Sequence, residues 1–328
     1  MSPPSATSPS STTNQVTTVL SQIKDSNNNK NEASKTKKQT PLQQISQGTV
    51  TLSGPPSHPT FARERQHRLN HMAASFCHWS RENYVFGFSG HISVRDPEYP
   101  SSFWTNPLGV HFGLLKASDM ILVNLRGQIV GGNRSRPANT AGFLIHGAIH
   151  EARPDVHAAC HAHSRYGRAF SALGKRLDMI SQDVCKFLGE AHAVYETYGG
   201  VVLVEEEGKH IARALGPKGK GVILKNHGLL TVGGTVDEAA WLFDVMEGAC
   251  RDQLLVDAAV GGGYDEREGK KMIIGEEEAR MNFELEGDAD YCYAEFQVYY
   301  QFEMAMARRD GLEFDDAEEM DVEIEVIE

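Results

Sequence analysis

Three histidines are spaced so that they could bind one metal ion. His161 and His163 lie two residues apart, and in a β-strand such side chains point to the same side. His227 follows the apolar segment 222–224 and precedes Gly228, where a side chain at a strand end can face a cleft. Three neutral imidazoles suit Zn²⁺, with Fe²⁺, Co²⁺ and Mn²⁺ as alternatives, and they leave a coordination position open for a substrate. The pattern predicts a catalytic metal that polarises a carbonyl or hydroxyl group.

The same residue types also have simpler explanations. A His-x-His pair is common by chance, and histidine is often a hydrogen-bonded side chain in a protein core. A second pair, His146 and His150, lies four residues apart and superficially resembles the zinc motif of metalloproteases. That motif requires a glutamate after the first histidine, and Gly147 stands there. We therefore do not expect this second pair to bind a metal.

Hydrophobic periodicity and turn residues predict a mixed α/β domain over residues 61–310. The expected helices cover 61–79, 139–152, 164–174, 207–215 and 235–255. The expected strands cover 86–94, 103–105, 120–124, 128–130, 156–163, 201–204 and 222–224. The strands do not alternate regularly with the helices. An antiparallel or mixed sheet with helices on both faces therefore fits better than a Rossmann fold.

Both ends of the chain have the composition of solvated tails. Residues 1–60 are rich in Ser, Thr, Asn, Gln, Pro and Lys and carry few large apolar side chains, which predicts disorder. Residues 311–328 contain nine acidic residues and no basic ones, and the mutual repulsion of these charges predicts a second tail. The alternating pattern over 321–326 leaves an edge strand open as an alternative.

Composition argues against several classes of function. The 328-residue chain has a net charge of −12, whereas a nucleic-acid-binding surface needs a basic excess. It has no run of about 18 apolar residues that would span a membrane. The five cysteines are odd in number and form no Cys-x-x-Cys pair, and the first ten residues lack the pattern of a secretory signal. These features predict a cytoplasmic protein.

Several short motifs together resemble the class II aldolase/adducin family. Arg153-Pro154-Asp155 is followed at short range by the His161/His163 pair, and Asn226-His227-Gly228 comes about 60 residues later. Further familial segments are 90–96, 106–109 and 117–120, so the resemblance covers most of 61–310. It implies a three-layer α/β/α domain with a central, mostly antiparallel sheet. It also implies a divalent metal at the three histidines and a homo-oligomer, often a cyclic tetramer with the site at a subunit interface.

The sequence departs from the aldolases of this family at the general acid/base. Those enzymes carry a glutamate about 11 residues before the Arg-Pro-Asp motif, and this chain has Gly142 there. Glycine cannot move a proton, so another group must substitute for the glutamate. We consider His91 and Asp183 as catalytic candidates. The unperturbed pKa of a histidine suits proton transfer at neutral pH, and the carboxylate of Asp183 could also accept a proton. Four tyrosines are open alternatives as proton donors: Tyr195, Tyr198, Tyr299 and Tyr300.

The family's phosphate turn is retained only in part. The resemblance suggests Gly90, Ser93, Asn106 and Gly109 as substrate-binding residues, but His91 stands inside the turn and two phosphate-binding serines are missing. A small, unphosphorylated oxo acid or hydroxy acid fits this pattern at least as well as a sugar phosphate. Arg95 and Arg136 could pair with a substrate carboxylate or form structural ion pairs.

Three functions are therefore compatible with the sequence. The first is lyase-type chemistry, either aldol cleavage or enolate formation, on a hydroxy-carbonyl or oxo-acid substrate. The second is an adducin-like module that binds the actin cytoskeleton without catalysis, which the missing glutamate favours. The third is a non-haem iron oxygenase or decarboxylase that holds its iron by three histidines.

Overall fold

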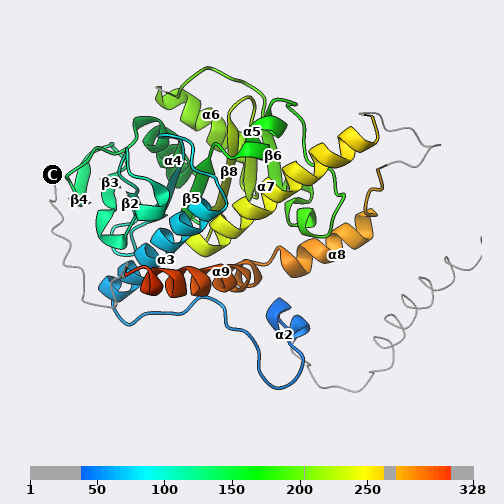
Figure 1. Cartoon of the computed structure of the whole chain (residues 1–328), viewed down its shortest axis with the longest axis horizontal. Coiled ribbons are helices and arrows are strands. Elements are labelled where there is room, and N and C mark those ends of the chain that lie inside the picture. Colours follow the sequence, from blue (N-terminus) through cyan, green and yellow to red (C-terminus); the bar gives the residue numbers. More distant parts are fainter. Residues whose placement is uncertain (1–37, 203, 262–270, 312–328) are drawn as a thin grey trace, which may run out of the picture. The chain divides into compact units, whose positions relative to one another are not determined.

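The described part of the chain is built around an eight-stranded sheet, whose strands spread from β4 at the left to β6 at the right among the helices in Figure 1. The structure is a computed structural model, and it describes residues 38–202, 204–261 and 271–311. The strand order is β4-β3-β2-β1-β5-β8-β7-β6, and every described pairing is antiparallel except β6 with β7. The strands are β1 (His91–Arg95), β2 (Ser102–Thr105), β3 (Ile121–Asn124), β4 (Ile129–Gly132), β5 (Ala158–Ala162), β6 (His192–Tyr195), β7 (Gly221–Leu224) and β8 (Gly228–Gly233).

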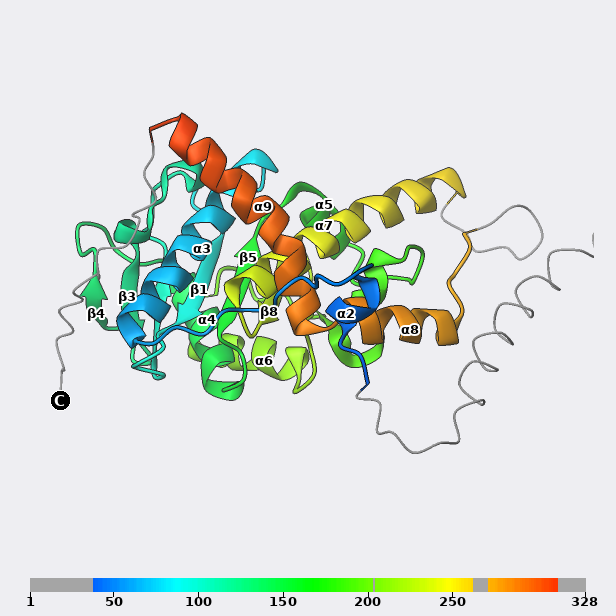
Figure 2. The same ribbon diagram turned by 90° about the horizontal axis from the view of Figure 1, so that it is seen from below.

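Helices cover both faces of this sheet (Figures 1 and 2). On one face α4 and α6 bury Ile145, Ile149 and Ile211 against the strands, and on the other face α3, α5, α7 and α9 build the larger core. The predicted α/β class with a central, mostly antiparallel sheet is therefore confirmed. The helices are α2 (Pro41–Ile45), α3 (Phe61–Arg81), α4 (Thr140–Ala152), α5 (Arg165–Ser171), α6 (Glu205–Leu215), α7 (Val236–Ala259), α8 (Glu276–Glu286) and α9 (Ala289–Arg309).

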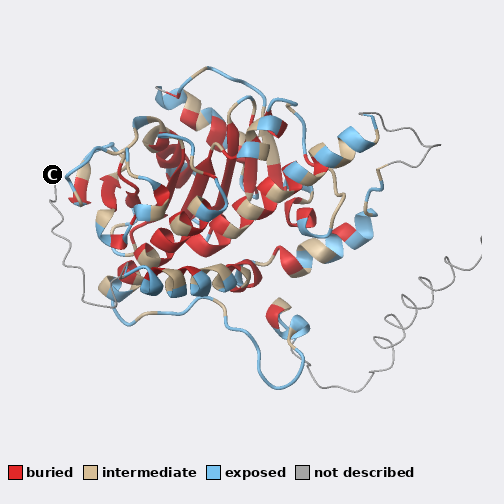
Figure 3. Ribbon diagram, viewed as in Figure 1, coloured by how far each residue is buried: buried red, intermediate tan, exposed pale blue. Residues whose placement is uncertain are grey.

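The central strands are buried because each is covered twice. All residues of β1, β2, β5, β7 and β8 are buried, and Figure 3 shows this as a continuous buried band through the sheet. Burial on both faces explains the nearly continuous apolar runs of β7 and β8, whereas β1 alternates the polar residues His91, Ser93 and Arg95 with Ile92 and Val94. None of the helices in the described part of the chain is long and apolar enough to cross a bilayer.

Local capping explains where the predicted helices begin. The Asn139 side chain accepts a hydrogen bond from Gly142 N–H at the start of α4, and the Thr235 side chain accepts one from Glu238 N–H at the start of α7. The expected strand at 201–204 is wrong, because none of its described residues is in a strand. The sheet edge is instead β6, which comes earlier in the chain and pairs in parallel with β7.

The compact unit that contains all these elements begins at Pro41. It includes part of the segment predicted as a tail: Leu42 of α2 is buried with Tyr291 and Ala294 of α9. The boundaries at residues 60 and 310 stay predictions. The predicted acidic tail lies outside the described residues except for Gly311, and so does the alternative edge strand at 321–326.

A buried ion pair joins α3 to the end of β1. Asp96 accepts hydrogen bonds from Arg65 Nε at 2.6 Å and Nη2 at 3.0 Å, and from the Trp104 indole at 2.7 Å. Burial opposes the charge on Asp96, but its bonds to Arg65 and Trp104 outweigh that effect and lower the pKa of the carboxyl group. The pair therefore stabilises the fold above about pH 4, and the stabilisation is lost as the pH falls through the lowered pKa.

We expect Asp96→Ala to lower the free energy of unfolding by about 3–5 kcal/mol, because it leaves the buried Arg65 without its main counter-charge. Urea unfolding at neutral pH measures the change. Asp155→Ala is the matched control, since it removes a carboxylate that is 64% exposed and pairs with Arg153. The control is expected to cost less than about 1 kcal/mol. Equal losses in the two variants would contradict the prediction.

Candidate metal centre

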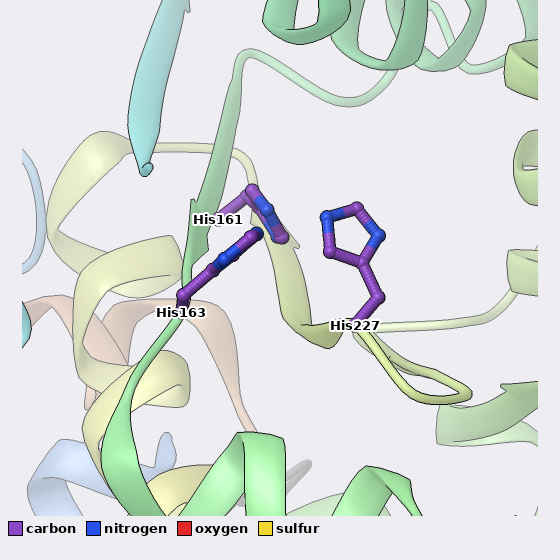
Figure 4. A group of neighbouring side chains, drawn as sticks. All are labelled: His161, His163 and His227. Carbon is purple, nitrogen blue, oxygen red and sulfur yellow. The ribbon is translucent and has the colours of Figure 1, made fainter. Parts of the chain in front are cut away.

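The structure brings the three predicted histidines together at one end of neighbouring strands. His161 lies on β5, and His163 follows immediately after the strand ends. His227 lies in the tight turn between β7 and β8, where Asn226 adopts a left-handed conformation with φ of 56°. Asparagine tolerates this conformation better than most residues. Because β5 pairs with β8, the turn places His227 opposite the end of β5 (Figure 4).

The spacing of the three rings suits a shared ion. The ring centroid of His227 is 4.8 Å from that of His161 and 4.7 Å from that of His163, and one nitrogen from each ring lies within 4.8 Å of the others. Metal–nitrogen bonds of about 2 Å hold ligand atoms about 4 Å apart or closer, so small ring rotations complete the site. Among the described residues, no carboxylate or thiol belongs to this group.

The sheet also orients one of the rings. Nδ1 of His161 lies 2.8 Å from the carbonyl oxygen of Leu229 on β8. A carbonyl can only accept, so Nδ1 carries the proton and Nε2 is left with a free lone pair. Histidine ligands of metals are commonly oriented by such a hydrogen bond from the second nitrogen. The donor set of this site therefore fits a divalent ion.

The surroundings keep these imidazoles neutral. Burial, with repulsion from His227 and Arg168, lowers the pKa of His163 to about 4. Burial also lowers the pKa of His227, and burial together with the neighbouring histidines lowers the pKa of His161 well below the usual value. Neutral rings are the form that binds a metal. A divalent ion bound by three neutral rings would keep its full charge.

A fourth histidine occupies the space beside Gly142. His91 on β1 pairs directly with His161 on β5, and the centroids of their rings are 4.8 Å apart. A Cβ atom placed on Gly142 would come within 2.7 Å of Cδ2 and 3.0 Å of Nε2 of His91. A side chain at residue 142 and the present position of the His91 ring therefore exclude each other.

Comparison with known proteins places this site in a family. A model of the class II aldolase and adducin N-terminal domain matches residues 70–254, a range that contains His91 and all three clustered histidines. The chain belongs to this family. Members of the class II aldolase family typically bind a divalent metal.

Individual relatives of this class II aldolase family differ in their names. The chain is 45% identical over 212 residues to the Meiotically up-regulated gene 14 protein of Schizosaccharomyces pombe, covering 65% of this chain and 81% of the relative. It is 42% identical over 209 residues to the 4-hydroxy-3-prenylphenylpyruvate oxygenase/4-hydroxy-3-prenylbenzoate synthase of Streptomyces roseochromogenus subsp. oscitans, covering 63% and 74%. The solved L-fuculose 1-phosphate aldolase of Glaciozyma antarctica PI12 superposes with a TM-score of 0.69 at 39% identity, covering 78% and 95%.

The other residues suggested by the class II aldolase resemblance lie in varied surroundings. Gly90 has a φ of 109°, and a Cβ there would come within 2.8 Å of the Phe112 ring, so its role in shaping the turn is explained. The side-chain oxygen of Asn106 is buried without a hydrogen-bond partner in the described part of the chain. Gly109 lies beside Arg136, with 3.6 Å between its Cβ position and Nη1. The side-chain oxygen of Asn106 is thus free to accept a hydrogen bond from a bound molecule.

Two of the suggested residues, Ser93 and Asp183, do not lie beside the three clustered histidines with a free side chain. Ser93 is completely buried, and its hydroxyl oxygen contacts His146 at 2.7 Å and His150 at 2.8 Å. Asp183 is 72% exposed and lines a surface pocket together with His78, and none of the three clustered histidines lines that pocket. Sequence reasoning considered the four-residue spacing of His146 and His150 only as a metalloprotease motif and missed their contacts.

The exclusion between Gly142 and His91 gives a testable stability effect. We expect Gly142→Ala to destabilise the protein by about 1–3 kcal/mol, because the new methyl group overpacks against the His91 ring. Gly147→Ala on the same helix is the control, since its Cβ would make an ordinary 3.4 Å contact with Phe143. Alanine there is expected to be neutral or stabilising by up to about 1 kcal/mol. Thermal unfolding compares the two, and an unaffected Gly142→Ala protein would show that the ring is free to move.

Proposed function

We propose that this protein is a divalent-metal enzyme that cleaves a carbon–carbon bond, or forms an enolate, next to the carbonyl group of a small oxo or hydroxy acid. The observation that carries the proposal is the cluster of three neutral imidazoles with a fourth histidine in the space beside Gly142. A folded scaffold without chemistry has no physical need for such a cluster, because burying polar rings costs free energy. The family and its usual divalent metal support the assignment.

The residues of the chain have separate tasks in this proposal. His161, His163 and His227 would hold the ion, which when bound supplies a Lewis acid for the substrate carbonyl. Their neutrality favours a substrate whose carboxylate balances the charge. His91 would act as the base: Nε2 takes the proton from the β-hydroxyl group, and a new carbonyl forms at the β-carbon as the bond between the α- and β-carbons breaks. The electron pair of that bond forms an enolate with the substrate carbonyl, and the proton is then returned to the α-carbon. Family enzymes commonly form oligomers, and we expect a homo-oligomer here as well.

A second candidate is oxidative decarboxylation of an oxo acid with iron and dioxygen. The absence of a carboxylate from the described ligand group favours it, and so does the 42% identity to a relative named an oxygenase. In this reaction the bond to the carboxyl carbon breaks and carbon dioxide leaves. One atom of dioxygen enters the carboxyl group of the shortened acid, and the other oxidises a second position of the substrate. An adducin-like binding module is the remaining alternative, because Gly142 removes the usual acid/base group.

One experiment separates these functions. The purified protein is loaded with zinc, manganese, cobalt or, without oxygen, iron, and metal content is measured by mass spectrometry. A panel of small oxo and hydroxy acids is then tested with and without dioxygen. Oxygen-independent cleavage supports the main proposal, whereas carbon dioxide release that needs both iron and oxygen supports the second. Failure to bind any metal, combined with cosedimentation with actin filaments, would overturn both in favour of the binding module.

A further inference from the structure

A continuous chain of buried polar side chains begins at His91 and runs away from the metal centre. Nδ1 of His91 lies 2.9 Å from Nε2 of His146, whose Nδ1 lies 2.7 Å from the Ser93 hydroxyl oxygen. The same oxygen lies 2.8 Å from Nε2 of His150. None of the four side chains is more than 4% exposed. These contacts are therefore hydrogen bonds inside the protein, closed to solvent.

Two regular elements with matching periods build this chain. His91 and Ser93 are two apart on β1, so both point to the face that α4 covers. His146 and His150 are four apart on α4, so they lie along one face of the helix, in line with Gly142. The glycine makes room for His91 at the start of this stripe. The two sets of side chains then interleave.

Proton counting limits how the chain can be connected. Each neutral histidine carries one ring proton and Ser93 carries one hydroxyl proton, which it donates to only one of its two neighbours. Four protons serve three contacts, and only two arrangements place one proton in each contact while the Ser93 hydroxyl donates to one of the histidines. In the first, every donor points away from the metal centre, and Nε2 of His91 has no proton. In the second, every donor points toward the metal centre, and Nε2 of His91 carries one.

The far end of the chain decides between the two arrangements. Nδ1 of His150 lies 3.3 Å from the carbonyl oxygen of Val156 and 3.4 Å from Nη2 of Arg95. Nη2 has two hydrogens and already faces three closer acceptors, the carbonyl oxygens of His150 at 2.6 Å, Val156 at 3.2 Å and Arg153 at 3.3 Å. The hydrogens of Nη2 point to these closer carbonyl oxygens, and the nearest neighbour of Nδ1 is the Val156 carbonyl, which can only accept. We therefore assign His150 as a donor to Val156, which selects the first arrangement.

We infer that His146, Ser93 and His150 are positioning residues that hold His91 in the tautomer with a protonated Nδ1 and a bare Nε2. Nε2 is the nitrogen nearest the empty Cβ position of Gly142, and it has no hydrogen-bond partner in the described residues. When it accepts a proton, the hydrogen bond from Nδ1 to His146 is kept, so the network supports both states. The tautomer follows from the hydrogen bonds alone, and only the role of Nε2 as the catalytic base rests on the proposed function.

Burial supports the neutral state of every ring in the chain. It lowers the pKa of His150 to about 3 and, with the neighbouring histidines, lowers the pKa of His91 and His146 well below the usual value. A second proton on His146 or His150 would also place two donors against each other. The number of protons counted above is therefore the number present at neutral pH.

The tautomer can be measured directly by nitrogen NMR of the imidazole rings in the zinc-loaded, ¹⁵N-histidine-labelled protein. We expect Nδ1 of His91 to carry the proton and Nε2 to be unprotonated. In His150→Phe, Ser93 loses its acceptor and can donate to His146, so the chain should reverse and place the proton on Nε2 of His91. A protonated Nε2 in the unmodified protein, or an unchanged tautomer in His150→Phe, would overturn the inference.

A kinetic comparison separates positioning from general stability. Ser93→Ala breaks the chain in the middle, and we expect kcat to fall by up to about 100-fold with KM and metal content unchanged. Ser75→Ala is the control, because Ser75 is equally buried but donates to the His71 carbonyl on α3. Equal effects of the two would overturn the positioning role. If Ser93→Ala does not fold, the inference is tested by the His91 tautomers that NMR measures in the unmodified protein and in His150→Phe. An inactive protein with the expected tautomer would reject the proposed function alone.

Discussion

Replacing His227 with alanine is expected to abolish stoichiometric metal binding while leaving the fold intact. His227 lies in the turn between β7 and β8 and is only partly buried. Its removal therefore creates little cavity. A three-histidine site that loses one ligand keeps two, and we expect the affinity for zinc to fall by roughly 10³-fold or more. Competition titration with a chromophoric chelator measures the change.

The other two ligands and a surface histidine complete this test. His161→Ala and His163→Ala are expected to lose metal as well, whereas His210→Ala should retain it, because His210 is an exposed residue of α6 paired with Glu206. The thermal stability of the ligand variants should fall only to that of the metal-free protein, since the lost stabilisation is the coupled binding energy. Unchanged stoichiometric zinc in the variants of His161 and His163 would show that the ligand assignment is wrong.

Replacing His91 with glutamine is expected to lower kcat by about 10²–10⁴-fold, the usual contribution of a general base. An amide can keep the hydrogen bond to His146 but cannot take up a proton. Metal content should remain stoichiometric, because His91 is not part of the group of three histidines proposed to bind the ion. Steady-state kinetics and metal analysis of the same preparation check both parts. Loss of metal as complete as in His227→Ala would identify His91 as a ligand instead of a base.

Because a side chain at residue 142 cannot coexist with the His91 ring, a second test asks whether a glutamate at residue 142 can replace His91 as the base. The double variant combines His91→Gly, which removes the imidazole ring, with Gly142→Glu, which introduces a carboxylate side chain at residue 142. The three atoms nearest to a Cβ on Gly142 all belong to His91, so the new side chain has room only in the double variant. We expect it to recover part of the activity that His91→Gln loses. Gly142→Glu alone should be destabilised and inactive.

The local parts of the site could be predicted from the sequence, and the contacts between distant segments could not. The His161/His163 spacing and the Gly228 turn are local patterns that the structure reproduces. The place of His91 depends on the register between β1 and β5, and the contact with His146 depends on which face of the sheet α4 covers. Neither is a property of a single segment, so both required the assembled fold.

The errors in the predicted elements have similar physical causes. The strand expected at 201–204 has the right apolar residues but follows two glycines, and the sheet edge is provided by β6 instead. Helix α9 was not predicted, although Asp288 caps it by accepting hydrogen bonds from Asp290 and Tyr291 N–H groups. Its signal was present as a helix-capping residue before an apolar stretch.

The position of β5 in the middle of the sheet has a consequence for the dynamics of the site. This strand is hydrogen-bonded on one side to β1 and on the other to β8, whereas β4 and β6 form the outer edges of the described sheet. Fraying of a sheet begins at its edges, and central strands open only with the whole domain. The backbone amides of 158–162 should accordingly be among the slowest to exchange with deuterated water. The proposed metal ligands His161, on β5, and His163, directly after it, are thus anchored to the part of the molecule that fluctuates least.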